Sequence, residues 1–158
     1  MNAQDIIDAL VISGICLREQ IEGCTEQEIA QLERKAGAPL PQQYKTFLAA
    51  AGRAAPGFFT GTDFYIRQVD GLTEDAADLL RENNEPFDLP AGAFVFSMHQ
   101  GYVFHYFILS DDADPPVYTY CEGKGMPRPA GESFSDYLLN SVDWHVRIAE
   151  EARAYSKP

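Results

Sequence analysis

The stretch Thr25–Leu48 reads TEQEIAQLERKAGAPLPQQYKTFL, and its local signals agree on two short helices. Thr25 stands three residues before Glu28, which is the spacing of a capping box: the hydroxyl accepts the Glu28 amide N–H while the carboxylate reaches back to the Thr25 N–H. Apolar residues then recur at helical spacing as far as Gly37, where a helix commonly ends in a left-handed residue. The sequence therefore predicts a first helix bounded by Thr25 and Gly37.

A second helix is predicted to start at Leu40-Pro41, because proline is tolerated in the first turn of a helix. The next apolar residues again keep helical spacing, and they form one stripe: Tyr44, Phe47, Leu48 and Ala51. We expect this stripe to pack into the main core.

These helices and several motifs further along the chain resemble the SUKH superfamily. The downstream motifs occur in the order of the family: Phe94-Val-Phe, Gly101-Tyr102, Asp114-Pro-Pro-Val-Tyr118 and Ser133-Phe134-x-x-Tyr137-Leu138, and Met98-His-Gln-Gly-Tyr102 looks like the turn of one bacterial subset. The resemblance covers residues 25–140. One departure is that the Asn-Gly-Gly common after the second helix of the family is replaced by residues 52–57, Gly-Arg-Ala-Ala-Pro-Gly.

The resemblance implies a binding domain. The eukaryotic founders of the superfamily are cell-wall synthesis regulators, and its many bacterial members are mostly inferred to be immunity proteins against polymorphic toxins. The length fits a single domain over residues 1–158, with residues 1–24 as an N-terminal helical extension, 25–140 as the part that resembles the family, and 141–158 as a C-terminal helix and tail.

The composition fits a folded domain with an acidic surface. Of the 158 residues, 46% are hydrophobic, which supports a real core. Twenty-four acidic against 12 basic residues give a formal net charge of −12. Such a surface repels phosphate backbones, so direct nucleic-acid binding is not expected, and it attracts a basic protein partner. The alternative is that the acidity serves only solubility.

We expect neither a membrane-spanning helix nor a secretion signal in this sequence. No apolar run approaches the roughly 18 residues of a membrane helix, and no basic segment precedes an apolar one at the start. The three cysteines, Cys16, Cys24 and Cys121, are an odd number without a Cys-x-x-Cys pair. They indicate reduced thiols and a cytoplasmic protein.

The order of periodic segments predicts an α+β fold, with an antiparallel meander packed against N- and C-terminal helices. Helices are expected over 4–20, with a strand over 9–17 as the alternative, over 73–81, and from 134 onward, where a break near 141–143 remains open. Strands are expected over 64–69, 94–98, 102–109 and 117–121, and the segment 122–131 is expected to be a loop. On the third of these strands Tyr102, Phe104 and Tyr106 share one face, which is either core or an open tyrosine surface.

No motif in the sequence carries catalytic chemistry. His99, His105 and His145 lack zinc-ligand spacing, so structural roles are expected and no metal or cofactor is predicted. A nucleophile and base pair of Cys121 and His105 on neighbouring strands would lack a third, orienting residue. The acids of residues 110–116 lack the glycine and distant glutamate of a calcium loop, and no glycine-rich phosphate loop precedes a helix. The protein is therefore expected not to be an enzyme.

The main hypothesis combines the resemblance with the acidic charge. It states that the protein is an immunity protein that binds a basic toxin domain, such as a nuclease, and that its Asp and Glu side chains mimic the phosphates that the target normally binds. The candidate partner-binding residues are acids in predicted loops together with one aromatic anchor: Asp111, Asp112, Asp114, Glu82, Glu85, Asp88 and Tyr102. A regulatory or scaffolding module is the second hypothesis, and a small hydrolase with a site around His99 and His105 is the third. The oligomeric state and the identity of the partner remain open at this point.

Overall fold

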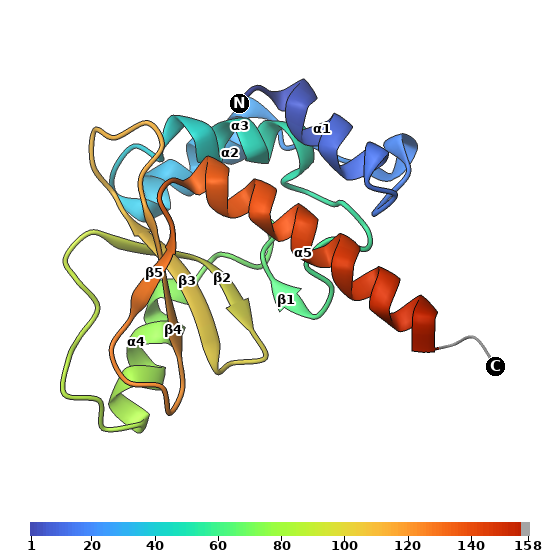
Figure 1. Ribbon diagram of the computed structural model, residues 1–158. Coiled ribbons are helices and arrows are strands. Elements are labelled where there is room, and N and C mark those ends of the chain that lie inside the picture. Colours follow the sequence, from blue (N-terminus) through green and yellow to red (C-terminus); the bar gives the residue numbers. More distant parts are fainter. Residues whose placement is uncertain (156–158) are drawn as a thin grey trace.

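The computed structural model describes residues 1–155, and it has an α+β fold with an antiparallel sheet between two layers of helices (Figure 1). In chain order the elements are α1 (Ala3–Ile12), the 3₁₀ turn η1 (Arg18–Gln20), α2 (Glu26–Ala36), α3 (Gln42–Ala51), β1 (Thr62–Asp63), α4 (Leu72–Glu82), β2 (Ala93–His99), β3 (Val103–Ile108), β4 (Val117–Cys121), β5 (Arg128–Gly131) and α5 (Phe134–Tyr155).

The two helices predicted from Thr25–Leu48 are confirmed as α2 and α3. The Thr25 hydroxyl accepts the Glu28 N–H at 3.2 Å, and the Glu28 carboxylate accepts the Thr25 N–H at 2.8 Å. Gly37 ends α2 with a φ of 75°, which only glycine adopts without strain. The Glu28 carboxylate also accepts the Arg53 Nε–H at 3.0 Å, so the start of α2 is tied to the segment after α3.

The sheet is a meander in the order β1-β2-β3-β4-β5, with every neighbouring pair antiparallel. The hairpin predicted between β2 and β3 turns at Gln100 and Gly101, whose φ angles are 49° and 76°. The Tyr102 N–H donates to the His99 carbonyl across this turn. The predicted antiparallel meander is thus confirmed.

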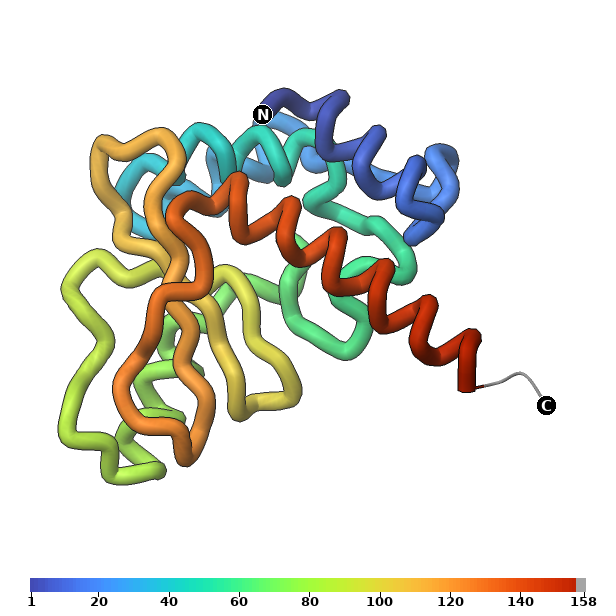
Figure 2. The backbone as a smooth tube through the Cα atoms, viewed as in Figure 1, coloured from blue at the N-terminus to red at the C-terminus, as the bar shows by residue number. Residues whose placement is uncertain are grey.

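Both faces of the sheet are covered. Helices α3 and α5 lie on one face and α4 lies on the other, as Figures 1 and 2 show. The core on the α3 side consists of stacked aromatic rings, with Tyr44 against Phe94, Phe107 and Phe134. On the α4 side the face of β3 that carries Tyr102, Phe104 and Tyr106 is mostly core, since Phe104 and Tyr106 are buried and Tyr102 is exposed.

The N-terminal helix is shorter than predicted. It ends at Ile12 instead of continuing to residue 20, and Ser13 caps it. Gly14 then adopts a φ of 73°, and the Cys16 thiol is buried after the turn. The prediction was wrong because it rested on the helical spacing of Leu17 and Ile21. The left-handed backbone conformation of Gly14 ends the helix before these residues are reached.

Two predictions in the sheet are wrong. Residues 64–69 form turns instead of a strand, because the Gln68 side-chain oxygen accepts the N–H groups of Phe64 and Tyr65 that a ladder would need. The short strand β1 lies just before them. The segment expected to be a loop contains β5, which pairs with β4 at the edge of the sheet, where Pro129 is tolerated without an N–H to donate.

The C-terminal helix α5 runs unbroken from Phe134 to Tyr155. Its start is capped by Ser133, whose hydroxyl accepts the Asp136 N–H at 3.0 Å. The break near 141–143 does not occur, and Ser141 instead donates its hydroxyl to the Tyr137 carbonyl one turn back. Within residues 1–155 no helix is both long and apolar enough to cross a lipid bilayer.

The α3 stripe gives a direct stability test. Phe47 is fully buried and its ring contacts Tyr44, Phe64 and Phe134. We expect Phe47→Ala to lower the free energy of unfolding by about 3–5 kcal/mol, as measured by urea denaturation. Gln42→Ala on the exposed side of α3 is the control and should change it by less than about 0.5 kcal/mol. A near-neutral Phe47→Ala would contradict this packing.

Candidate functional site

The structure divides the predicted partner-binding residues between two ends of the sheet. Asp111, Asp112 and Asp114 lie in the loop after β3, which we call the loop end. Tyr102 directly precedes β3 and so lies at its opposite end, beside the β2–β3 turn. Figure 1 shows this turn and the loop after β3 at opposite ends of the sheet. Six strand residues separate the two positions, or about 20 Å at the rise of a β-strand.

The remaining acids lie at the end of α4 and in the segment that follows it. The segment after α4 runs beside β4, where the Phe87 ring contacts Tyr120 and the Glu85 carboxylate accepts the Tyr120 hydroxyl at 2.7 Å. Tyr120 lies directly opposite Phe104, near the start of β3. We define the hairpin end as Tyr102 together with Glu82, Glu85 and Asp88 of this segment, of which Glu85 is the one that these contacts place against β4. The single surface of seven residues is therefore two surfaces.

Some of these acids also hold the fold together. The Asp114 carboxylate accepts the Ser135 N–H at 2.9 Å at the start of α5, and the Asp112 carboxylate accepts the Asp114 N–H at 3.0 Å. Burial, and then the hydrogen bond to the Glu85 carboxylate, raise the pKa of Tyr120 to about 12. Asp111 and Asp112 remain exposed, and 39% of Tyr102 is exposed.

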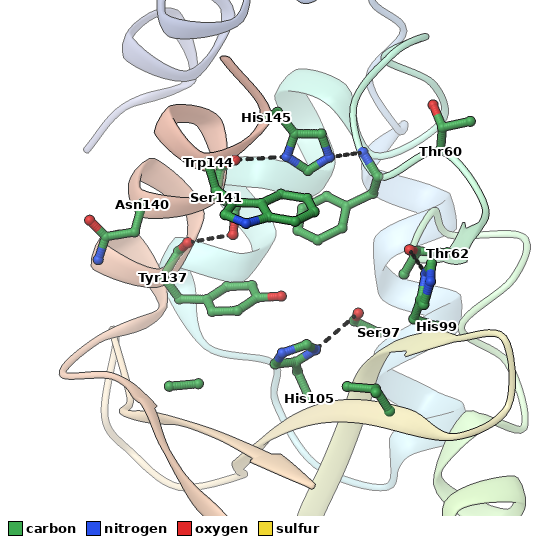
Figure 3. Close-up of a pocket in the computed structure, with 13 residues that line it drawn as sticks. Thr60, Thr62, Ser97, His99, His105, Tyr137, Asn140, Ser141, Trp144 and His145 are labelled. Atoms are coloured by element: carbon green, nitrogen blue, oxygen red, sulfur yellow. Dashed lines mark hydrogen bonds between the residues drawn. The ribbon is translucent and has the colours of Figure 1, made fainter. Parts of the chain in front are cut away.

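A cavity of about 530 Å³ lies between α5 and the sheet, and all three histidines of the chain line it (Figure 3). Its walls come from the turn before β1, from β2, β3 and β5, and from one face of α5. The lining residues are Phe59, Thr60, Thr62, Ser97, His99, Val103, His105, Ala130, Tyr137, Asn140, Ser141, Trp144 and His145.

His145 fixes the turn before β1 to α5. Its Nδ1 lies 2.7 Å from the Ser141 carbonyl, which only accepts, so Nδ1 carries the proton. Its Nε2 then accepts the Phe59 N–H at 3.0 Å. Phe59 has a φ of 51°, an uncommon value for a residue with a side chain, and His145 holds it there.

The other two histidines pair with hydroxyls on the cavity floor. His99 Nδ1 lies 2.8 Å from the Thr62 hydroxyl, and His105 Nδ1 lies 3.4 Å from that of Ser97. A register shift between Val95 and Ser97 brings Ser97 opposite His105. Burial lowers the pKa of His105 to about 4, so its imidazole is neutral at physiological pH.

This arrangement lacks the features of nucleophilic catalysis. The distance of 3.4 Å from Ser97 to His105 is long for a nucleophile and its base, and no acidic residue lines the cavity to orient the imidazole. Cys121 lies opposite Val103, while His105 lies opposite Thr119, so the strands do not pair Cys121 with His105. Within residues 1–155 no group of three or more His, Cys, Asp or Glu side chains is placed to hold a metal ion.

Sequence reasoning treated the histidines one by one and missed the cavity. His99 and His105 come from one hairpin, but His145 lies far along the chain on α5 and reaches the same space only through the fold. No spacing in the sequence signals this meeting.

The buried imidazole of His105 predicts how stability depends on pH. The pKa of His105 is about 4 in the folded protein and 6.5 in the unfolded chain. As the pH falls below 6.5, the unfolded chain therefore takes up a proton on this residue while the folded protein does not, which favours unfolding. Its contribution to stability is complete above pH 6.5 and is lost below it. Between pH 7.5 and 5 this loss is about 2 kcal/mol.

The His105→Gln variant should therefore lose less stability over this pH interval than the unsubstituted protein, as measured by urea denaturation at both pH values. His145, whose pKa burial also lowers, is present in both proteins and cancels in the difference. Equal pH dependence in the two proteins would show that His105 is not buried as a neutral group.

The comparison with known proteins identifies the family. A family model described as SMI1-KNR4 cell-wall, SUKH_6, matches residues 26–138, from the first residue of α2 through the whole sheet into the start of α5. No curated protein is significantly similar to the chain. The match covers well over half of the 158 residues and includes both acidic ends. The chain therefore belongs to the SMI1-KNR4 family of the SUKH superfamily.

Proposed function

We propose that this protein is a non-catalytic immunity protein, which binds a bacterial toxin domain and inhibits it. Membership of the SUKH superfamily carries the proposal, since that membership supports an immunity role or a role like that of the cell-wall regulators. The cavity geometry is consistent with binding, because His105 is a weak base with no carboxylate to orient it.

The charge of the chain favours a basic partner. With a net charge of −12, the protein attracts a target rich in Lys and Arg, such as a nuclease domain, and speeds its encounter with that target. Carboxylates on the inhibitor would then occupy the positions that nucleic-acid phosphates take in the target. The toxin is best sought in the gene next to that of this protein, by testing its product for inhibition.

We place the main contact at the hairpin end. It combines three acids with the partly exposed ring of Tyr102, and aromatic anchors surrounded by polar residues dominate many protein interfaces. At the loop end, Asp114 caps α5 and Asp112 accepts the Asp114 N–H, whereas at the hairpin end Glu85 is engaged with Tyr120. We expect the loop end to contribute mainly to the long-range electrostatic attraction of a basic partner.

The description of the family model favours one alternative, a regulatory module related to cell-wall synthesis. Co-purification with housekeeping proteins, and no inhibition of a neighbouring toxin, would support it. A hydrolase is the third function, and it would be supported by an activity that His99→Gln or His105→Gln abolishes while the fold survives.

Two variants with equal charge change separate the two ends. Glu82→Gln/Glu85→Gln/Asp88→Asn and Asp111→Asn/Asp112→Asn/Asp114→Asn each remove three negative charges, and the amide oxygens keep the acceptors for Tyr120 and Ser135. We expect the hairpin-end variant to slow association with the toxin more strongly and to flatten its salt dependence, as measured by stopped-flow fluorescence. Equal or reversed effects would exclude the hairpin end as the main contact.

Tyr102 should act on the lifetime of the complex. We expect the Tyr102 side chain to be a buried anchor in the complex. Tyr102→Ala should therefore speed dissociation by at least about tenfold and leave the association rate nearly unchanged. Tyr155→Ala is the matched control, since Tyr155 is 92% exposed at the far end of α5. Unchanged dissociation in Tyr102→Ala would place the interface elsewhere.

A further inference from the structure

We propose that the cavity between α5 and the sheet is a binding site for a small, uncharged, planar aromatic molecule with a hydrogen-bonding edge. The proposal is independent of the proposed toxin, and it rests on the size, charge, polar groups and rings of the cavity.

The cavity has the size and position of a ligand site. Its volume of about 530 Å³ lies within the range of about 300–1,000 Å³ typical of small-molecule pockets. Figure 3 shows side chains from α5 and from the sheet that face each other across it, with the Trp144 indole on the α5 side. Half of Trp144 is exposed, so the wall that it forms borders solvent.

The lining contains no acidic residue, lysine or arginine, although the chain has 24 acidic and 12 basic residues. Burial keeps His105 in its neutral form. A charged ligand would lose its hydration in this cavity without gaining a counter-charge. The ligand is therefore uncharged.

Polar groups on the floor provide a hydrogen-bonding edge. Ser97 is fully buried beneath this floor, so its hydroxyl orients His105 through Nδ1 and does not itself face a ligand. His105 Nε2 has no hydrogen-bond partner among residues 1–155. The hydroxyl of Thr62, paired with His99, lies on the same floor (Figure 3). An amide or similar edge, with both a donor and an acceptor, matches these groups.

Aromatic rings form the walls, and they are already in place. The Phe59 ring lies parallel to that of Tyr137 with 6.3 Å between centroids, and Tyr137 lies 5.0 Å from His105. Trp144 meets the His145 ring edge-on at 5.0 Å. Because His145 fixes both the Phe59 backbone and α5, this wall does not have to form on binding. These rings contact one another, and a wall built of aromatic rings favours a planar aromatic guest.

Three probes of similar size test the ligand class: benzamide, benzoate and cyclohexanecarboxamide. Benzamide has the aromatic ring and the neutral amide edge, benzoate adds a charge, and cyclohexanecarboxamide removes the aromatic ring. The readout is NMR of the three histidine rings and of the Trp144 indole, which is the sole tryptophan of the chain. We expect saturable shifts of these signals with benzamide at a Kd on the order of 1 mM, and at least tenfold weaker binding of the other two.

A matched pair of substitutions tests the location. Val103→Phe adds a ring inside the cavity, and Val146→Phe adds the same ring on α5 outside it. Val103→Phe should weaken benzamide binding at least tenfold, and Val146→Phe should leave it unchanged. If Val103→Phe fails to fold, Asn140→Trp at the exposed rim serves the same purpose. Absent or dispersed shifts with benzamide, equal binding of benzoate, or undiminished binding to the filled cavity would overturn the proposal.

Discussion

The packing of Tyr44 against four phenylalanine rings is the interaction on which the rest of the structure depends. Its ring lies 5.3–6.0 Å from those of Phe94, Phe96, Phe107 and Phe134, and so joins α3 to β2, β3 and the start of α5. The Tyr44 hydroxyl is buried without a hydrogen-bond partner among residues 1–155. Such a group costs about 1–3 kcal/mol, which the burial of five rings offsets.

This cluster decides which surfaces the domain presents. It holds only the start of α5 to the sheet, so Trp144, Ile148 and Tyr155 further along the helix are exposed. The cavity lies where α5 leaves the core, beside Tyr137. Because helices cover both faces of the sheet, the candidate partner-binding residues lie at its two ends, in loops and at the last residue of α4.

The parts of the fold that depend on local chemistry could be predicted from the sequence. The Thr25 capping box, the Gly37 cap and the β2–β3 turn each depend on neighbours within a few residues, and each is confirmed. Two failures came where a side-chain or distant partner decided the outcome, whereas the N-terminal helix ended early at a local feature, the turn at Gly14. The Gln68 side chain accepts N–H groups of the expected strand, so these are not available to a neighbouring strand. The segment with Pro129 forms β5 because it pairs with β4.

The candidate sites were less predictable for the same reason. Acidic residues in loops could be recognised, but only the fold separates the loop end from the hairpin end. The three histidines share one cavity because α5 crosses the sheet there, and no local pattern encodes that crossing.

The most direct test of the central claim, that this protein inhibits a toxin by binding it, is a titration of toxin activity at a toxin concentration well above the Kd. Binding predicts a linear loss of activity that ends at a fixed stoichiometric ratio, with activity recovered when the complex is separated. Complete inactivation by a small fraction of an equivalent would show turnover and contradict the account, as would activity that is unaffected at any ratio.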